Sequence, residues 1–336
     1  MVSSAVVELR DLSVHFRTDQ GTLNVVDGVS FSVPRGHTLC LVGESGCGKS
    51  VTSLAIMGLL PQPPAVIAGG QAVFDGRDLL AMDGKELGGL RGDRLSMIFQ
   101  EPMTSLNPVF TVGDQLVEVI ERHRPIAGAE ARGHAIEMLR RVRIPAPEQR
   151  MGEYPHQLSG GMRQRIMIAM ALANDPALLI ADEPTTALDV TIQAQILELI
   201  KTLQRETGTA VLLITHDLGV VAEVADQVAV MYAGQIVELA PVAALFADPQ
   251  HPYTLGLMSS IPRIDGDAEG PLPTIAGSVP PPTAFPAGCR FSSRCPFADA
   301  RCRTDVPPLA DLAPGHQVAC WKAPLERALA VAEDAA

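Results

Sequence analysis

Eight consecutive residues, Gly43 to Ser50, have the types and the spacing needed to hold a phosphate group. They form the string GESGCGKS, which matches the pattern GxxxxGK[ST]. Glycines let the backbone curl until its N–H groups face an anion, and the N-terminus of a following helix adds positive potential. In such a loop the Lys49 ammonium reaches the terminal phosphates, and the Ser50 hydroxyl is a ligand of Mg²⁺. The string therefore predicts a nucleotide phosphate site.

Two carboxylates provide a second group with chemistry suited to phosphate transfer. The apolar run ALLIAD ends at Asp182, and Glu183 follows directly. A buried strand that ends in Asp182 puts a carboxylate at the mouth of a sheet, where Mg²⁺ binds in phosphate-handling enzymes, and Glu183 could orient the attacking water. Alone this signal is weak, because many strand ends carry acids that favour solubility. Together with the phosphate loop it predicts hydrolysis of a nucleotide triphosphate.

The elements expected around these residues alternate between buried strands and helices. Short apolar runs without alternation are typical of strands buried on both faces of a parallel sheet, and they occur at 37–43, 177–182 and 210–217. Helices are expected over 50–60, 112–142, 160–173 and 192–206, and residues 5–45 favour strands and turns. The strand, glycine loop and helix around Gly43 form one α/β unit. The expected fold class is therefore α/β.

Composition and charge narrow the classes of protein to consider. The 336 residues are 47% hydrophobic and carry a net charge of −12, which argues against a nucleic-acid binder because such proteins need a basic face. No apolar run approaches the roughly 20 residues that span a bilayer. The N-terminus lacks the basic and apolar regions of a signal peptide. We expect a chain that is neither secreted nor membrane-spanning and that has no nucleic-acid partner.

Four of the six cysteines fall in the C-terminal tail, after a stretch rich in proline and glycine over 262–290. They are Cys289, Cys295, Cys302 and Cys320. Structural disulfides are rare in the cytosol, and the tight C-x₂₋₄-C knuckle with which zinc sites usually begin does not occur here. Four thiolates also suit an iron–sulfur cluster. From the residues alone, a cluster, a zinc site and unliganded thiols all stay open.

Further motifs carry a resemblance to a known family. Leu158-Ser-Gly-Gly-Met162, followed by RQR, resembles the signature motif of the ABC ATPases, and it lies shortly before the predicted ALLIAD strand. Gln100 resembles the Q-loop glutamine, TALD at 186–189 the D-loop, and His216 the switch histidine. Phe16 lies where that family has an aromatic residue stacked on adenine. The resemblance covers residues 5–245.

The resemblance implies a fold and a division of the chain. It implies a P-loop NTPase core of the RecA-like type, with an N-terminal antiparallel β-subdomain and a helical subdomain over about 101–160. The nucleotide-binding domain would span 1–250, and a C-terminal extension with the four cysteines would span 251–336. In this family two ATPase chains face each other head to tail. Each ATP is held between the phosphate loop of one chain and the LSGG motif of the other.

The resemblance also assigns roles to individual residues. It implies Glu183 as the base, His216 as a contact of the γ-phosphate and the water, and Gln100 as a sensor of Mg²⁺ and of the membrane partner, with Lys49 also catalytic. The implied Mg²⁺ ligands are Ser50, Gln100 and Asp182. The implied nucleotide contacts are Phe16, Gly43, Glu44, Ser45, Gly46, Cys47, Gly48, Lys49, Ser50, Val51, Ser159, Gly160, Gly161 and Asp189.

More specific strings narrow the resemblance to one group of importers. YPHQL at 154–158, EPMTSLNP at 101–108, HPYT at 251–254 and the cysteine-bearing tail resemble the ATPases of oligopeptide, dipeptide and nickel importers, especially their D-type subunits for dipeptides and oligopeptides. Members of that group carry a [4Fe–4S] cluster on a four-cysteine tail, so the resemblance implies one on Cys289, Cys295, Cys302 and Cys320.

This resemblance also implies partners and a location. It implies a heterodimer with a second, F-type ATPase subunit, beneath two transmembrane permease subunits served by an extracytoplasmic substrate-binding protein. The chain would then lie peripherally on the cytoplasmic face of the cell membrane and power peptide import.

Three other functions are alternatives to peptide import. An importer of the same family for nickel, glutathione or antimicrobial peptides would share every motif above, because cargo contacts lie in other subunits. A soluble ABC ATPase of translation or DNA repair usually carries two cassettes or long coiled-coil inserts, and the sequence predicts neither. A stand-alone redox or iron–sulfur protein would leave the ATP motifs without a role.

Overall fold

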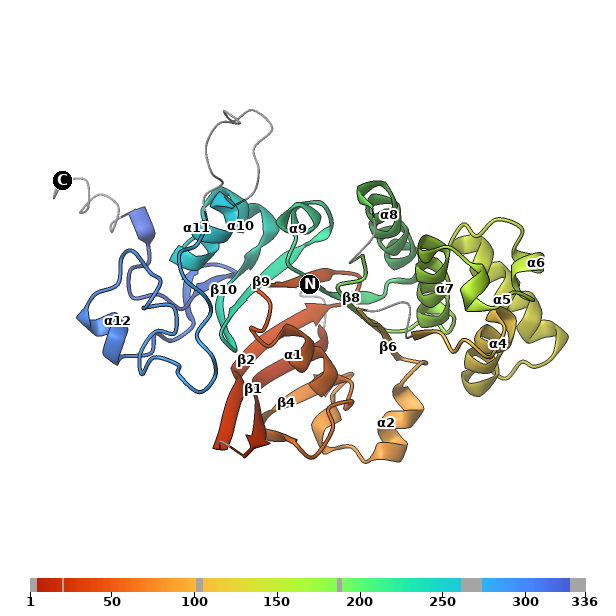
Figure 1. Ribbon diagram of the computed structural model, residues 1–336, viewed down its shortest axis with the longest axis horizontal. Coiled ribbons are helices and arrows are strands. Elements are labelled where there is room, and N and C mark those ends of the chain that lie inside the picture. The colour runs from red at the N-terminus through yellow and green to blue at the C-terminus, as the bar shows by residue number, and fades with distance from the viewer. Residues whose placement is uncertain (1–4, 20, 101–104, 186–188, 261–273, 327–336) are drawn as a thin grey trace. The chain divides into compact units, whose positions relative to one another are not determined.

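The computed structural model describes residues 5–19, 21–100, 105–185, 189–260 and 274–326 (Figure 1). The chain divides into two compact units. The first comprises the described residues up to Val7, Val33–Thr38 and Ala81–Ile214. The second comprises Glu8–Ser32, Leu39–Leu80 and the described residues from Thr215 onward. This division does not test the predicted boundary at residue 250 between the nucleotide-binding domain and the C-terminal extension, which stays a prediction.

Three parallel strands form the centre of the first unit. Their order is β8–β7–β6, and β7 pairs in parallel with both neighbours. Nearly all of their side chains are buried, as expected for runs of apolar residues in a parallel sheet. The bounds are β6 (Leu95–Ile98), β7 (Leu178–Asp182) and β8 (Ala210–Thr215). Two of these were predicted as buried strands, and both predictions are confirmed.

Helices α4, α5, α6 and α7 gather together in the first unit, and α7 packs against both α4 and α5 (Figure 1). The helix predicted over 112–142 is divided into α4 and α5, because Pro125 cannot continue a helix and Gly128 adopts φ 60° before α5. A capping box between Thr111 and Asp114 fixes the start of α4. The helices of this unit are α2 (Gly84–Leu90), α4 (Val112–His123), α5 (Ala129–Arg141), α6 (Pro147–Arg150), η2 (Pro155–Gln157), α7 (Gly160–Leu172) and α8 (Val190–Thr207).

The second unit contains a sheet built from the N-terminal part of the chain. Its strand order is β2–β1–β4–β5, and β4 pairs with β5 in antiparallel fashion. The second half of β2 alternates between buried and partly exposed side chains, which is the pattern of a sheet with one face on a core. The bounds are β1 (Ala5–Thr18), β2 (Gly21–Pro34), β4 (Ala65–Phe74) and β5 (Arg77–Asp78), followed by the turn η1 (Leu79–Ala81).

Other strands of the second unit lie in the order β3–β9–β10–β12–β11. The β3–β9 pair is parallel, and the remaining pairs are antiparallel, so the C-terminal tail contributes β11 and β12 to this sheet. The strands are β3 (Thr38–Val42), β9 (Gln227–Tyr232), β10 (Gln235–Pro241), β11 (Ala310–Ala313) and β12 (His316–Val318). The helices are α1 (Lys49–Ile56), α9 (Leu218–Val224), α10 (Val242–Ala247), α11 (Pro252–Ser259) and α12 (Ala300–Thr304).

A buried carboxylate fastens the tail to this sheet. Glu238 on β10 has no exposed surface. Its oxygens accept hydrogen bonds from the backbone N–H groups of Gln250 (2.7 Å) and His251 (2.9 Å), and Nε2 of His316 lies 2.8 Å away. A buried carboxylate is tolerated only when it is paired in this way. Glu238 thus joins β10, the start of α11 and β12.

His251 is also fully buried and begins α11. Its Nδ1 accepts a hydrogen bond from the backbone N–H of Tyr253 at 3.0 Å. Burial lowers the pKa of His251 to about 3, so the ring is neutral and can accept that bond at ordinary pH. The HPYT string at 251–254 therefore has a structural role at the start of a helix.

Among the described residues, no helix combines the length and the apolar character required to cross a bilayer.

We expect Glu238→Ala to lower the free energy of unfolding by roughly 3 kcal/mol or more, because it leaves three buried donors without their acceptor. Thermal melting followed by circular dichroism measures this loss. Glu8→Ala is the control, since the Glu8 side chain pairs with Arg10 at the surface, where ion pairs contribute little to stability. Equal shifts of the melting temperature in both variants would contradict the role given to Glu238.

Candidate functional site

The predicted phosphate loop connects β3 to α1 in the second unit. Gly43 has φ +154° and Gly48 has φ +105°, and Gly48 is the N-cap of α1. A Cβ at Gly43 would lie 2.2 Å from the Met231 carbonyl oxygen, and one at Gly48 would lie 2.9 Å from the Val25 carbonyl oxygen. Both positions therefore require glycine, because the loop passes against the backbones of β9 and β2.

Lys49 is buried beneath this loop, with a relative exposure of 6%. Its Nζ donates to the carbonyl oxygens of Gly43 at 2.7 Å and Glu44 at 3.0 Å. These two bonds hold the ammonium against the inside of the turn. Ser45 and Gly46 at the tip are exposed, whereas Ser50 and Val51 at the start of α1 are half-buried. The loop thus offers one cation and exposed backbone at its tip, which is the chemistry that a phosphate chain requires.

Glu44 is held at both its backbone and its side chain by residues far along the sequence. Its N–H donates to the Tyr253 hydroxyl at 2.8 Å. Its two carboxylate oxygens accept from the Arg294 guanidinium at 2.6 and 3.0 Å, a bidentate geometry. The sequence predicts Glu44 only as a member of the loop. Tyr253 belongs to the HPYT string, but nothing in that string indicates a contact with Glu44, and Arg294 has no local pattern that identifies it.

The two carboxylates predicted for catalysis lie at the end of β7 in the first unit. Asp182 is buried, whereas Glu183 is half-buried and adopts φ 45°, a left-handed conformation that is uncommon outside glycine. The Glu183 N–H donates to the Ile214 carbonyl at 2.9 Å, which fixes this turn. Gln100, just beyond β6, donates from Nε2 to Oε2 of Glu183 at 3.0 Å. The structure therefore brings together two of the predicted catalytic residues.

The signature motif forms the start of α7, also in the first unit. Ser159 is the N-cap, and its Oγ accepts from the Met162 N–H at 3.3 Å, so Gly160 and Gly161 form the first turn. Farther along α7, the buried Gln164 donates from Nε2 to the Pro184 carbonyl. This bond ties the signature helix to the residue after Glu183, and sequence reasoning had given Gln164 no role of its own.

The other predicted site residues lie on separate elements. Asp189 is the N-cap of α8 and accepts from the Ile192 N–H at 3.0 Å. Phe16 is half-buried on β1, and His216 is exposed directly after β8. Residues 186–188 of the TALD string and 101–104 of the EPMTSLNP string lie outside the described residues.

The four tail cysteines are free thiols in one region of the second unit. A Cβ at Gly288 would lie 2.5 Å from the Cys302 carbonyl oxygen, so the chain before Cys289 passes close to α12. The Cys289 N–H then donates to that carbonyl at 2.8 Å. The backbones of Cys289 and Cys302 are therefore in contact. The thiols of Cys289, Cys295 and Cys302 also raise the pKa of Cys320.

Backbone N–H groups point at three of these sulfurs. Burial raises the pKa of the Cys295 thiol to about 11 and that of Cys320 to about 12, and the neighbouring thiols add to each shift. Hydrogen bonds from the N–H groups of Phe297 and Lys322, each two positions beyond its cysteine, oppose it. The Lys322 nitrogen lies 3.4 Å from the Cys320 sulfur. Cys289 receives the same kind of bond from Phe291 and Ser292.

Within the part of the chain that the structure describes, no three or more His, Cys, Asp or Glu side chains are arranged to hold a single metal ion. The four tail thiols therefore do not form such a set.

Comparisons with known proteins agree with the motifs. A family model described as "ABC transporter" matches residues 26–186, and one described as "Oligopeptide/dipeptide transporter, C-terminal region" matches residues 237–302. The second model covers most of β10, all of α11 and three of the four tail cysteines. Two regions of one chain thus match two independent models.

Similar proteins support the same assignment along nearly the whole chain. The oligopeptide transport ATP-binding protein OppD of Bacillus subtilis (strain 168) is 51% identical over 316 residues, which are 94% of this chain and 88% of that protein. The dipeptide transport ATP-binding protein DppD of the same organism is 53% identical over 317 residues, 94% of each chain.

A solved structure shares the fold of the cassette. The ATP-binding cassette MJ0796, in a dimeric post-hydrolysis state bound to ADP and Pi, superposes with a TM-score of 0.63 at 27% identity and covers 70% of this chain and 98% of its own. The motifs, the family models and the similar proteins all indicate the same family. This chain belongs to the ABC transporter ATPases, in the group that includes the ATP-binding proteins of oligopeptide and dipeptide transport.

Proposed function

We propose that this chain is the ATPase subunit of an importer that carries peptides across the cell membrane, and that it works at the cytoplasmic face. One observation carries the proposal. A complete phosphate loop and the C-terminal region of oligopeptide and dipeptide transporters occur in a single chain. The first supplies ATP chemistry, and the second distinguishes this group from ABC ATPases in general.

The roles of the site residues follow from their chemistry. Lys49 and the backbone N–H groups of Gly43 to Gly48 hold the phosphates, with Ser50 and Asp182 as ligands of Mg²⁺. Glu183 orients and deprotonates the attacking water. The hydrogen bond from Gln100 to Glu183 supports a link between the Q-loop and the base. The signature turn Ser159–Gly161 faces the nucleotide of a second ATPase chain, because a helix N-terminus with exposed amides suits an anion.

The same reasoning assigns partners. A nucleotide held between two cassettes requires a second ATPase subunit, and we propose a distinct one of the F type. Two permease subunits provide the transmembrane path, and an extracytoplasmic binding protein delivers the peptide. The relatives named above are described as transport ATP-binding proteins, which supports a membrane partner.

We further propose that the four tail thiols hold a [4Fe–4S] cluster. Four thiolates suit such a cluster, and the backbone N–H groups that donate to Cys289, Cys295 and Cys320 favour the thiolate form of each. Cys289, Cys295, Cys302 and Cys320 would be its ligands. The cluster would cross-link the tail.

We expect Glu183→Gln to keep ATP binding but to lower turnover by roughly 10²- to 10⁴-fold, because the amide cannot accept a proton from water. Phosphate release from the assembled transporter and binding of labelled ATP give the two readouts. Glu206→Gln is the control, since Glu206 is an exposed residue of the same unit that pairs with Arg141. Near-normal turnover in Glu183→Gln would remove this residue as the base.

We expect protein purified without oxygen to be brown, with about four irons per chain and broad absorbance near roughly 400 nm. Cys295→Ser should lose most of the iron, whereas Cys40→Ser should keep it, because Cys40 is buried in β3, where it pairs with Val228 of β9. Metal analysis and visible spectroscopy measure both. A colourless preparation that contains zinc would contradict the cluster.

A further inference from the structure

Arg294 lies next to Cys295 in the tail, yet its guanidinium reaches the phosphate loop. Its side chain is only 4% exposed, and it donates to both oxygens of Glu44. Phe291, three residues earlier, packs edge-on against Tyr232 at the end of β9, with ring centroids 5.2 Å apart. The cysteine-bearing segment is therefore in direct contact with the loop that precedes Lys49.

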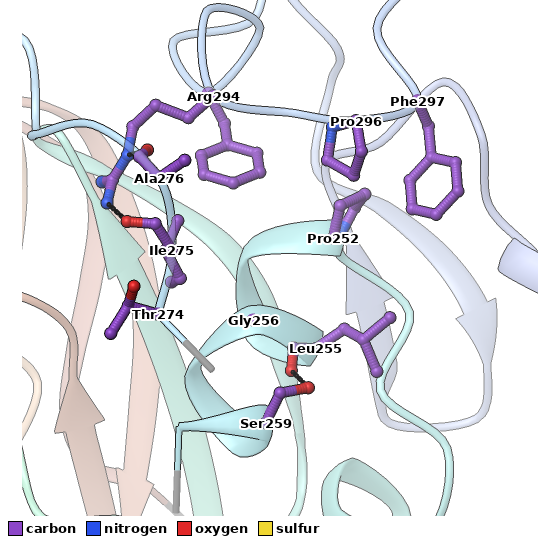
Figure 2. A pocket seen from close by; sticks show the side chains of 11 residues that line it. Pro252, Leu255, Gly256, Ser259, Thr274, Ile275, Ala276, Arg294, Pro296 and Phe297 are labelled. Atoms are coloured by element: carbon purple, nitrogen blue, oxygen red, sulfur yellow. Dashed lines mark hydrogen bonds between the residues drawn. The ribbon is translucent and has the colours of Figure 1, made fainter. Parts of the chain in front are cut away.

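The remaining N–H groups of Arg294 hold a third segment. They donate to the carbonyl oxygens of Ala276 at 2.9 Å and of Ile275 and Gly277 at 3.3 Å each. Figure 2 shows the guanidinium reaching the Ile275 carbonyl. This segment and α11 line a mainly apolar cavity of about 330 Å³, and Arg294 forms part of its wall. The low exposure of Arg294 strengthens its ion pair with Glu44, because burial lowers the local dielectric on one side of the pair.

The fold leaves Glu44 little freedom. The backbone N–H of Glu44 donates to the Tyr253 hydroxyl, and the Glu44 carbonyl oxygen accepts from Lys49 Nζ. The Glu44 carboxylate accepts from the Arg294 guanidinium. The carboxylate belongs to a loop that must attract a triphosphate. A negative charge at this position opposes an anion unless a cation neutralises it. Arg294 is the cation whose guanidinium contacts that carboxylate.

We propose that Arg294 is a positioning residue for ATP binding, which neutralises Glu44 and fixes the phosphate loop from within the cysteine-bearing tail. The proposal rests on the proposed function of that loop, but it does not depend on an iron–sulfur cluster. A consequence is reciprocal coupling: whatever loosens the tail around Arg294 weakens nucleotide binding, and bound nucleotide holds the tail in place.

The test is a charge rescue with the full chain. We expect Arg294→Gln to raise the Kd for Mg²⁺-bound AMP-PNP about fivefold to tenfold, as loss of a charge-assisted hydrogen bond would. The double variant Arg294→Gln with Glu44→Gln should recover to within about twofold of the parent, because the uncompensated carboxylate is gone. Isothermal titration calorimetry measures each Kd. A residue that only supports the fold would give no recovery in the double variant.

Arg301→Gln is the matched control. Arg301 lies in the same cysteine-bearing tail, but its guanidinium stacks on the Trp321 ring and pairs with Asp305. We expect a Kd within about twofold of the parent. If Arg301→Gln weakens nucleotide binding as much as Arg294→Gln, or if Arg294→Gln leaves the Kd unchanged, the proposal is overturned.

A conservative variant keeps the test decisive if Arg294→Gln does not fold. Arg294→Lys keeps the positive charge but cannot donate to both oxygens of Glu44 as the guanidinium does. The Kd of this variant for AMP-PNP should therefore lie between those of the parent and of Arg294→Gln. A Kd in Arg294→Lys that equals the parent's would refute the bidentate contact as the positioning element. Failure of the parent chain itself to bind AMP-PNP would instead contradict the proposed function.

Discussion

The close approach of the phosphate loop to neighbouring backbone is the constraint on which the nucleotide site depends. Gly43 lies against the Met231 carbonyl and Gly48 against that of Val25, so a side chain at either position would force the loop outward. The Gly234 N–H also donates to the Cys47 carbonyl at 2.9 Å. The curvature of the loop is therefore set by β2 and by the turn after β9, as much as by its own glycines. The position of Lys49 follows from that curvature.

Much of this arrangement is predictable from the sequence because it is encoded locally. The runs that became β3, β7 and β8 are short, apolar and without alternation, and each is buried as expected. The loop pattern gave the start of α1, and the acids after ALLIA gave the end of β7. The LSGG string gave an N-cap at Ser159, where a serine before two glycines suits a helix start.

What the sequence did not reveal are the contacts between distant residues. Glu44 and Arg294 are separated by 250 positions, and an arginine between two serines and a cysteine has no periodicity to mark it. Gln164 likewise looked like part of a signature string, although its amide holds the turn after Glu183. The division of the 112–142 helix was visible in principle, because Pro125 and Gly128 interrupt it, but the apolar spacing on both sides favoured continuity.

The pairing of β12 with β10 has a consequence for how far the chain can be shortened. Glu238 and Leu239 of β10 register with Val318 and Gln317 of β12. A protein cut at the usual end of a cassette would present β10 as an open edge to solvent, with unpaired backbone groups and with the Glu238 side chain stripped of its donors. Exposed edges of that kind recruit other strands and promote aggregation. For this protein, the tail is thus a solubility element that a minimal cassette would lack.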